Sequence, residues 1–337
     1  MNSSRADKVL FGFEFQVYAG LYLMLKFPHE FENIKIEGDE DIEILLADTT
    51  RLFAQAKSFT KPYDSKNSYI KNRFEKGLET LSKVKCGVND KLIYISNMPD
   101  RPLGIEHNQF GEEYYYHFEE LSKDNKDTIL SIIKKANLTI DTGKLIVAGF
   151  PFYGEDPEQK CRAVLGKLRE LLVGIDSRLY SMAPRILKYW ASCLLDNGAE
   201  GDKNKTIEKR RMIWDLIAFC LVATGNNDKL LVEAGFDELK VYEASNLYEE
   251  FIHMKENQFP DYNRIILLKE KYSTGDYRVA SIGDFVKDKS EEIKDIIFPK
   301  GTESKIDQNL RETCAALIAC NILLKKSTIT KILKEME

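Results

Sequence analysis

The chain lacks a long apolar segment. Its longest strongly apolar run, residues 214–223 of 337, is about half of the roughly 20 residues that a helix needs to cross a bilayer. The polar N-terminus also lacks the apolar region of a signal peptide. We therefore expect a cytoplasmic protein without a membrane-spanning segment.

Cysteine and histidine are scarce and scattered. The six cysteines form no CxxC pair, and the four histidines have no zinc-like spacing. We expect the thiols to be mostly buried. The sequence also has no P-loop, no GxGxxG after a strand and no GxSxG, so nothing in it supports nucleotide hydrolysis or acyl transfer.

The composition is 43% hydrophobic and 31% charged, which is typical of a folded globular protein, and the length allows two domains. The formal net charge is −5. An excess of acidic residues excludes nucleic-acid binding through a globally basic surface, so such binding would need a local cluster of Lys and Arg.

The first half alternates helix and strand patterns. Apolar residues at helical spacing predict helices over residues 8–26, 68–84 and 123–136, and short apolar runs predict strands over 34–36, 42–46, 52–57, 91–95 and 144–148. Residues 48–50 are of types that favour turns, and they lie between two of these strands. Residues 114–118 fit a strand or a packed loop. This order predicts an α/β fold, a mixed sheet flanked by helices.

After Pro157 only helical periods are clear, over residues 158–173, 184–195, 207–223, 241–254, 262–271 and 310–324. These predict an all-α second domain. We place the α/β domain at residues 1–153 and the helical domain at residues 157–337. The residues around this boundary are of types that favour a turn.

An acidic strand entry followed by Gln-x-Lys is the most informative pattern. Asp41 directly precedes one strand, and Gln55 and Lys57 lie on the next. Since side chains alternate along a strand, Gln55 and Lys57 point to the same face. Asp41, Gln55 and the Ala56 carbonyl would suit Mg²⁺ or Mn²⁺, and Lys57 would stand beside an attacking water.

These residues resemble the PD-(D/E)xK nuclease superfamily, in its variant with Gln in place of the second acid. Together with residues 12–16 of the first helix and with Glu37 and Glu40, they look like the effector nuclease domain of bacterial antiphage systems of the CBASS and Lamassu types, closest to the Lamassu effector. The resemblance implies a restriction-endonuclease-like fold over residues 8–150 and Mg²⁺-dependent cleavage of double-stranded DNA, held inactive until infection is sensed.

The metal carboxylate is not unique in the sequence, because five acids lie close together: Glu37, Asp39, Glu40, Asp41 and Glu43. We choose Asp41 because it stands directly before the apolar run. Glu14 is a further candidate catalytic residue, since it lies on the apolar face of its helix. It would either face the metal site, as a ligand or by holding Lys57, or else extend to solvent or pair with a lysine at the edge of the core.

Residues 57–76 carry six basic residues against two acids, next to the acidic stretch. Candidate DNA-binding residues in this region are Lys61, Lys66, Lys71, Arg73 and Lys76. Basic residues beside a metal pocket suit phosphate binding. The alternative is that these side chains only solvate one face of a helix.

The helical half would mediate self-association or docking to other subunits. Cutting both strands needs two active sites, so we expect a dimer or tetramer in the active state. The resemblance further implies an SMC-like ATPase and an accessory subunit as partners. The rival hypothesis is a non-catalytic adaptor, in which a degenerate nuclease fold binds DNA or assembles a defence complex.

Overall fold

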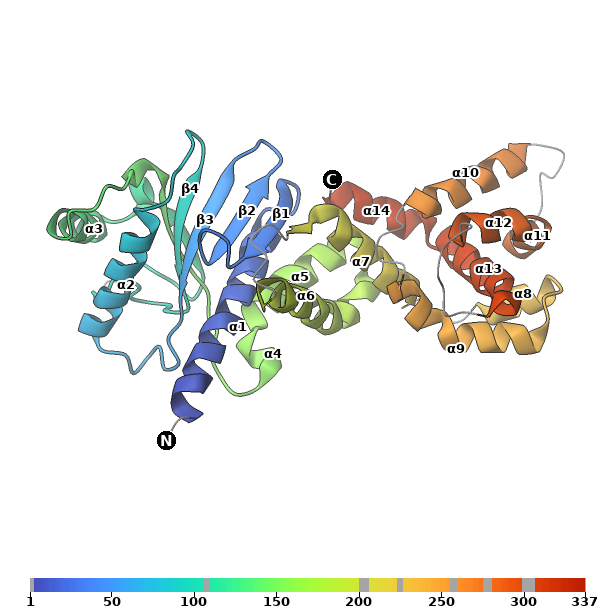
Figure 1. Cartoon of the computed structure of the whole chain (residues 1–337), viewed down its shortest axis with the longest axis horizontal. Helices are drawn as coiled ribbons and strands as arrows, with labels where there is room; N and C mark the ends of the chain where they lie inside the picture. The colour runs from blue at the N-terminus through green and yellow to red at the C-terminus, as the bar shows by residue number, and fades with distance from the viewer. Residues whose placement is uncertain are drawn as a thin grey trace. The chain divides into compact units, whose positions relative to one another are not determined.

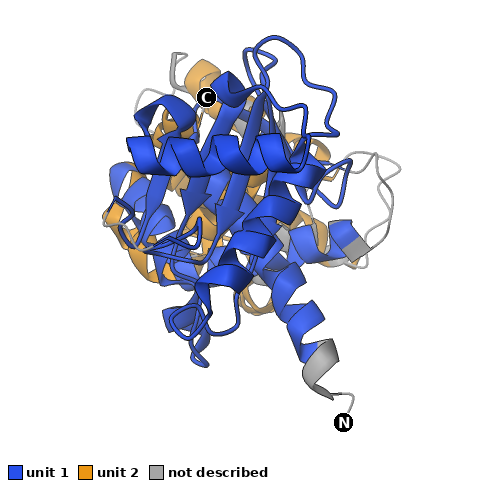
Figure 2. Ribbon diagram, turned by 90° about the vertical axis from the view of Figure 1, so that its left-hand side faces the viewer, with its two compact units in different colours: residues 1–174, 183–209 blue, residues 175–182, 210–337 orange. Residues whose placement is uncertain are grey.

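The computed structural model describes residues 3–105, 109–199, 206–222, 227–254, 260–274, 281–298 and 307–336. The chain forms two compact units (Figure 2). Unit 1 comprises residues 1–174 and 183–209, and unit 2 comprises residues 175–182 and 210–337. No helix among the described residues is long and apolar enough to cross a membrane.

Unit 1 is built on a seven-stranded mixed sheet with the strand order β5-β6-β4-β3-β2-β1-β7. The strands are β1 (Phe31–Ile36), β2 (Ile42–Leu46), β3 (Arg51–Lys57), β4 (Lys91–Ser96), β5 (Tyr114–His117), β6 (Leu145–Gly149) and β7 (Ile207–Glu208). β1, β2 and β3 form an antiparallel meander, whereas β3, β4 and β6 are parallel. Parallel neighbours need long crossovers, and helices supply them here.

Helices cover both faces of this sheet (Figure 1). The helices of unit 1 are α1 (Ser3–Lys26), α2 (Asn67–Leu81), α3 (Lys123–Lys135), α4 (Pro157–Lys160), α5 (Arg162–Ile175) and α6 (Ala183–Ala199), with short 3-10 turns at Phe118–Glu120 and Thr142–Lys144. α1 packs on β1, β2 and β3, and α6 packs on α1 and β1. α2 packs on β3 and β4, and the apolar side chains of α2 and α3 share one buried cluster with the strands: Phe53, Phe74, Leu78, Tyr94, Ile129, Ile132 and Val147.

Unit 2 is helical. It contains a 3-10 segment (Ser177–Met182) and the helices α7 (Lys209–Val222), α8 (Asp228–Glu233), α9 (Glu238–Met254), α10 (Pro260–Thr274), α11 (Ile282–Asp288), α12 (Ser290–Ile297), α13 (Gln308–Leu324) and α14 (Lys326–Met336). α13 contacts α8, α9, α10, α11, α12 and α14. A helix surrounded in this way must be apolar on nearly all sides, and residues 314–320 are all buried.

The mixed α/β sheet and the helical second half are confirmed. We expected the first domain to end at residue 153 and the second to begin at residue 157. Unit 1 instead continues through α4, nearly all of α5, α6 and β7. Ile207 and Glu208 extend the sheet by pairing with β1. Of the six cysteines, four are buried and two, Cys86 and Cys193, are half-buried.

Candidate active site at the ends of β2 and β3

The candidate site lies where β2 begins and β3 ends. Ile42 of β2 pairs with Ala54 of β3, and continuing this register places Asp41 opposite Gln55. Oδ2 of Asp41 accepts a hydrogen bond from the Ala56 N–H at 2.8 Å and a second one from Nε2 of Gln55. Since Gln55 is buried, with 3% of its surface exposed, these contacts fix the aspartate against β3.

Lys57 shares this environment. Burial lowers the pKa of its ammonium group, and the positive charge of Arg73 lowers it further, while Asp41 acts in the opposite direction. The influence is mutual, because Lys57 lowers the pKa of Asp41 whereas burial raises it. The structure therefore brings Asp41, Gln55 and Lys57 together at one edge of the sheet, as the strand alternation predicts.

The other acids of the stretch divide into two groups. Burial and the neighbouring Asp41 raise the pKa of Glu40 to about 7, and the same two causes raise the pKa of Glu37. Glu43 instead closes the turn, since its Oε1 accepts hydrogen bonds from the backbone N–H groups of Asp39 and Glu40. Glu37 and Glu40 therefore lie close to Asp41, in a place where burial disfavours the charged form of all three acids.

Gln16 of α1 belongs to the site; the family resemblance includes it within residues 12–16 but assigns it no role. Hydrogen bonding by its side chain lowers the pKa of both Glu37 and Asp41. Four residues later, Gly20 lets α1 approach the sheet so closely that an added Cβ would lie 2.9 Å from the Ile34 side chain. A glutamine one turn before such a glycine is the signal that could have identified it.

Glu14 has a different partner. Its carboxylate forms an ion pair with Lys160 of α4. The ammonium group of Lys160 also lies 4.9 Å from the ring centroids of Phe11 and Phe152. Of the two alternatives for Glu14, pairing with a lysine at the core edge is therefore the one observed.

The donor chemistry of the site fits a hard cation. Within the described residues no three His, Cys, Asp or Glu side chains converge on one point, so such an ion would depend on mixed oxygen ligands and water, as Mg²⁺ commonly does. The N–H and C=O of one strand residue point to the same neighbour, so the Ala56 carbonyl faces the side of Asp41. Gln16 Oε1 and Glu40 Oε2 are buried and have no hydrogen-bond partner in the described part of the chain, although buried polar atoms are usually paired.

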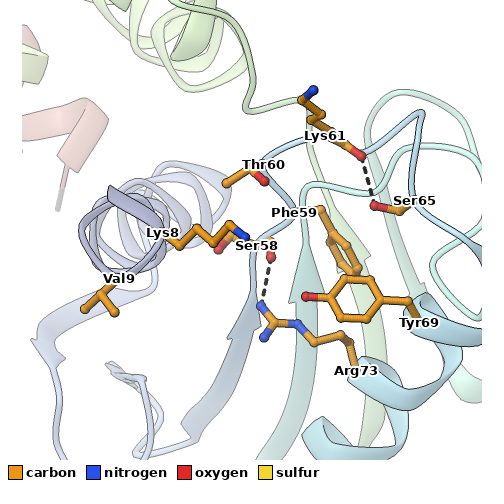
Figure 3. A pocket seen from close by; sticks show the side chains of 9 residues that line it. All are labelled: Lys8, Val9, Ser58, Phe59, Thr60, Lys61, Ser65, Tyr69 and Arg73. Carbon is orange, nitrogen blue, oxygen red and sulfur yellow. Dashed lines mark hydrogen bonds between the residues drawn. The ribbon is translucent and has the colours of Figure 1, made fainter. Parts of the chain in front are cut away.

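A cation-lined cavity begins directly after Lys57 (Figure 3). It has a volume of about 560 Å³, and Ser58, Lys61 and Arg73 are among the residues that line it. The Arg73 guanidinium donates a hydrogen bond to the Ser58 carbonyl at 2.9 Å. The other candidate DNA-binding residues, Lys66, Lys71 and Lys76, are exposed but do not line this cavity.

No family model, curated protein or solved structure matches this chain.

Proposed function

We propose that unit 1 is a Mg²⁺- or Mn²⁺-dependent DNA endonuclease with a restriction-endonuclease-like fold. The observation that supports this most directly is the convergence of Asp41, Gln55 and Lys57 on one edge of the sheet. An antiparallel meander that continues into parallel strands between two helical layers also agrees with the resemblance to PD-(D/E)xK nucleases.

In this proposal Asp41, Gln55 and the Ala56 carbonyl hold the metal ion. The bound ion would supply positive charge and lower the pKa of a coordinated water. Gln55 would have to present its amide oxygen, which requires a rotation of the amide from the orientation in which Nε2 faces Asp41. Glu37 and Glu40 lie beside Asp41, and a bound divalent cation would favour the charged forms of these carboxyl groups, whose pKa values are otherwise raised.

Lys57 acts on the phosphate and the attacking water. Its ammonium group can donate hydrogen bonds to a non-bridging phosphate oxygen, where negative charge grows as the bond to phosphorus forms. Because burial lowers its pKa, the group also exchanges a proton with water more readily than an exposed lysine does. Arg73 adds a second positive charge on the same side.

The biological setting follows from the resemblance alone. We propose an effector of a bacterial antiphage defence system that is active as a dimer or tetramer, with unit 2 as the surface for self-association or for an SMC-like ATPase and an accessory subunit. Unit 2 exposes apolar side chains on α9, including Leu239 at 75% and Tyr242 at 65% exposure, which is compatible with a docking role.

Cleavage of plasmid DNA tests the enzymatic proposal. The wild-type chain, concentrated or combined with its partners, should cut plasmid in Mg²⁺ or Mn²⁺ and stop when EDTA is added. Lys57→Ala should reduce the rate about 100-fold or more, because one preorganised electrostatic contact to the transition state is lost. The rate of plasmid loss on a gel measures the effect.

Lys135→Ala is the matched control, since this lysine is exposed on α3 and lies outside the site. It should retain the wild-type rate. Circular dichroism should show that Lys57→Ala keeps its fold, because the lysine sits at the rim of the sheet rather than in the core. Intact plasmid under every metal and partner condition would refute the nuclease proposal.

A non-catalytic adaptor is the second candidate. The observation that favours it is that Gln55 presents nitrogen to Asp41, so that the two residues satisfy each other without a metal. Under this alternative, Mg²⁺ would leave the thermal stability of unit 1 unchanged, and the wild type would not cut DNA. Lys57→Ala would then affect only folding or DNA binding.

A further inference from the structure

The cavity that begins at Ser58 combines cations with an aromatic face. Lys8 from α1 and Arg73 from α2 extend toward Ser58, while the amine of Lys61 points away from the rings (Figure 3). None of the described residues that line it is acidic. Its volume of about 560 Å³ lies within the range of roughly 300–1,000 Å³ that is usual for small-molecule sites.

The guanidinium group of Arg73 is fixed in a position where it can bind an anion. Its guanidinium donates one hydrogen bond to the Ser58 carbonyl and lies 5.7 and 5.8 Å from the ring centroids of Phe59 and Tyr69. Nε of Arg73 is buried without a hydrogen-bond partner among the described residues. An unpaired buried donor is costly, and phosphate oxygens are strong acceptors for a guanidinium.

Tyr69 supplies a surface for stacking. Phe59 meets it edge-on, with an interplanar angle of 88° and centroids 5.8 Å apart, which leaves Phe59 2% exposed and Tyr69 51% exposed. Aromatic side chains of this kind stack on nucleic-acid bases regardless of sequence. In a duplex the base faces are already covered by their neighbours, so only an unpaired base can use the ring.

We propose that this cavity binds one unpaired nucleotide of the substrate strand, with its phosphate on Lys8 and Arg73 and its base on Tyr69. Ser58 directly follows Lys57, so this nucleotide would be adjacent to the cleaved phosphate. The preferred substrate is then DNA with a single-stranded segment or a frayed end rather than a fully paired duplex. The identity of the strand rests on the proposed nuclease function, but its binding can be measured without cleavage.

Binding in EDTA tests the cavity independently of catalysis. The full chain is titrated against a fluorescent blunt hairpin duplex and against the same hairpin carrying an oligothymidylate tail. The wild type should bind the tailed hairpin more tightly. Tyr69→Ala should weaken binding of the tailed hairpin about tenfold, the effect of losing one stacked base, and leave the blunt hairpin unchanged.

Two variants serve as controls. Tyr69→Phe keeps the ring and should bind like the wild type. Tyr242→Ala removes a comparably exposed tyrosine from α9 of unit 2 and should also have no effect. The proposal is overturned if the chain binds neither DNA in EDTA, or if Tyr69→Ala weakens both DNAs equally or neither. It is also overturned if free thymidine monophosphate competes as strongly as the tail, which would indicate a site for a free nucleotide.

Adding Mg²⁺ separates this inference from the nuclease proposal. If the binding pattern holds but the wild type cuts neither DNA, the nucleotide site stands and the nuclease proposal fails. If the wild type cuts DNA and Tyr69→Ala cuts tailed and blunt hairpins at wild-type rates, the nuclease proposal stands and the nucleotide site is refuted.

Discussion

Two side chains of α1 that are two residues apart lie in different environments. The side-chain amide of Gln16 lowers the pKa of Glu37 and of Asp41, whereas Glu14 is paired with Lys160. The difference follows from the helical turn of about 100° per residue, which separates positions two apart by about 200°. Gln16 is therefore the residue of α1 that can influence the candidate metal site.

Substituting these two residues separates the alternatives for α1. Gln16→Leu should reduce DNA cleavage about tenfold or more, because two acids lose a donor that stabilises their charged forms. Glu14→Gln should keep the wild-type rate within about twofold and lower the melting temperature slightly, since a partly exposed ion pair contributes about 1 kcal/mol or less. Cleavage rates with Mg²⁺ and thermal unfolding measure both. If Glu14→Gln loses cleavage while Gln16→Leu remains active, then Glu14 rather than Gln16 is the catalytic residue of α1.

At the scale of single elements, the strands were the most predictable part of the fold. The expected strands over residues 42–46, 52–57 and 91–95 match β2, β3 and β4 to within one residue, because each is a short apolar run with turn signals at its ends. The side-chain alternation that joins Gln55 to Lys57 followed from the same pattern. Gln16 did not, because its position depends on where α1 crosses the sheet.

Apart from the eleven-residue helix α14, the elements that were not predicted from the sequence are short or depend on a partner. α8, α11 and α12 have six to eight residues, about two turns, which is too few for a helical period to stand out. β7 consists of two residues that become a strand only by pairing with β1. Strand formation of this kind is decided by the neighbouring strand rather than by local preference.

α2 packs against the sheet in close contact at Gly77. A Cβ added at Gly77 would lie 2.7 Å from the ring of Tyr94, which is fully buried. Gly77→Ala should therefore destabilise unit 1 by about 1–3 kcal/mol, since neither the helix nor the ring has room to move. It should also slow cleavage, because displacing α2 moves Arg73 away from Ser58. Urea denaturation followed by circular dichroism measures the stability.

Gly166 provides the matched control. It lies within α5 of the same unit, and nothing is within 4 Å of an added Cβ. Gly166→Ala should stabilise unit 1 by about 0.4–1 kcal/mol, because alanine restricts the unfolded chain and favours the helix. The two substitutions should thus shift the unfolding midpoint in opposite directions. A shift of the same sign for both would contradict the packing argument.

At the scale of the whole molecule, the division into units follows packing rather than composition. Helical periods dominate after residue 157, yet α6 packs on α1 and β1, and an added Cβ at Gly198 would lie 2.8 Å from the ring of Phe13. Lys209 donates a hydrogen bond to the His29 carbonyl at 2.7 Å. The α/β unit therefore uses helices from the second half of the chain to cover its own sheet.

Truncation tests this division. A chain that ends after residue 209 retains α6 and β7 and should unfold cooperatively on heating. A chain that ends after residue 154 exposes the apolar surface that α6 covers on α1 and β1. It also lacks β7, so one side of β1 is unpaired, and both changes favour aggregation. It should melt at a clearly lower temperature or precipitate. Equal melting temperatures and equal solubility would instead support a domain that ends near residue 153, because the covering helices would then contribute nothing to the stability of the sheet.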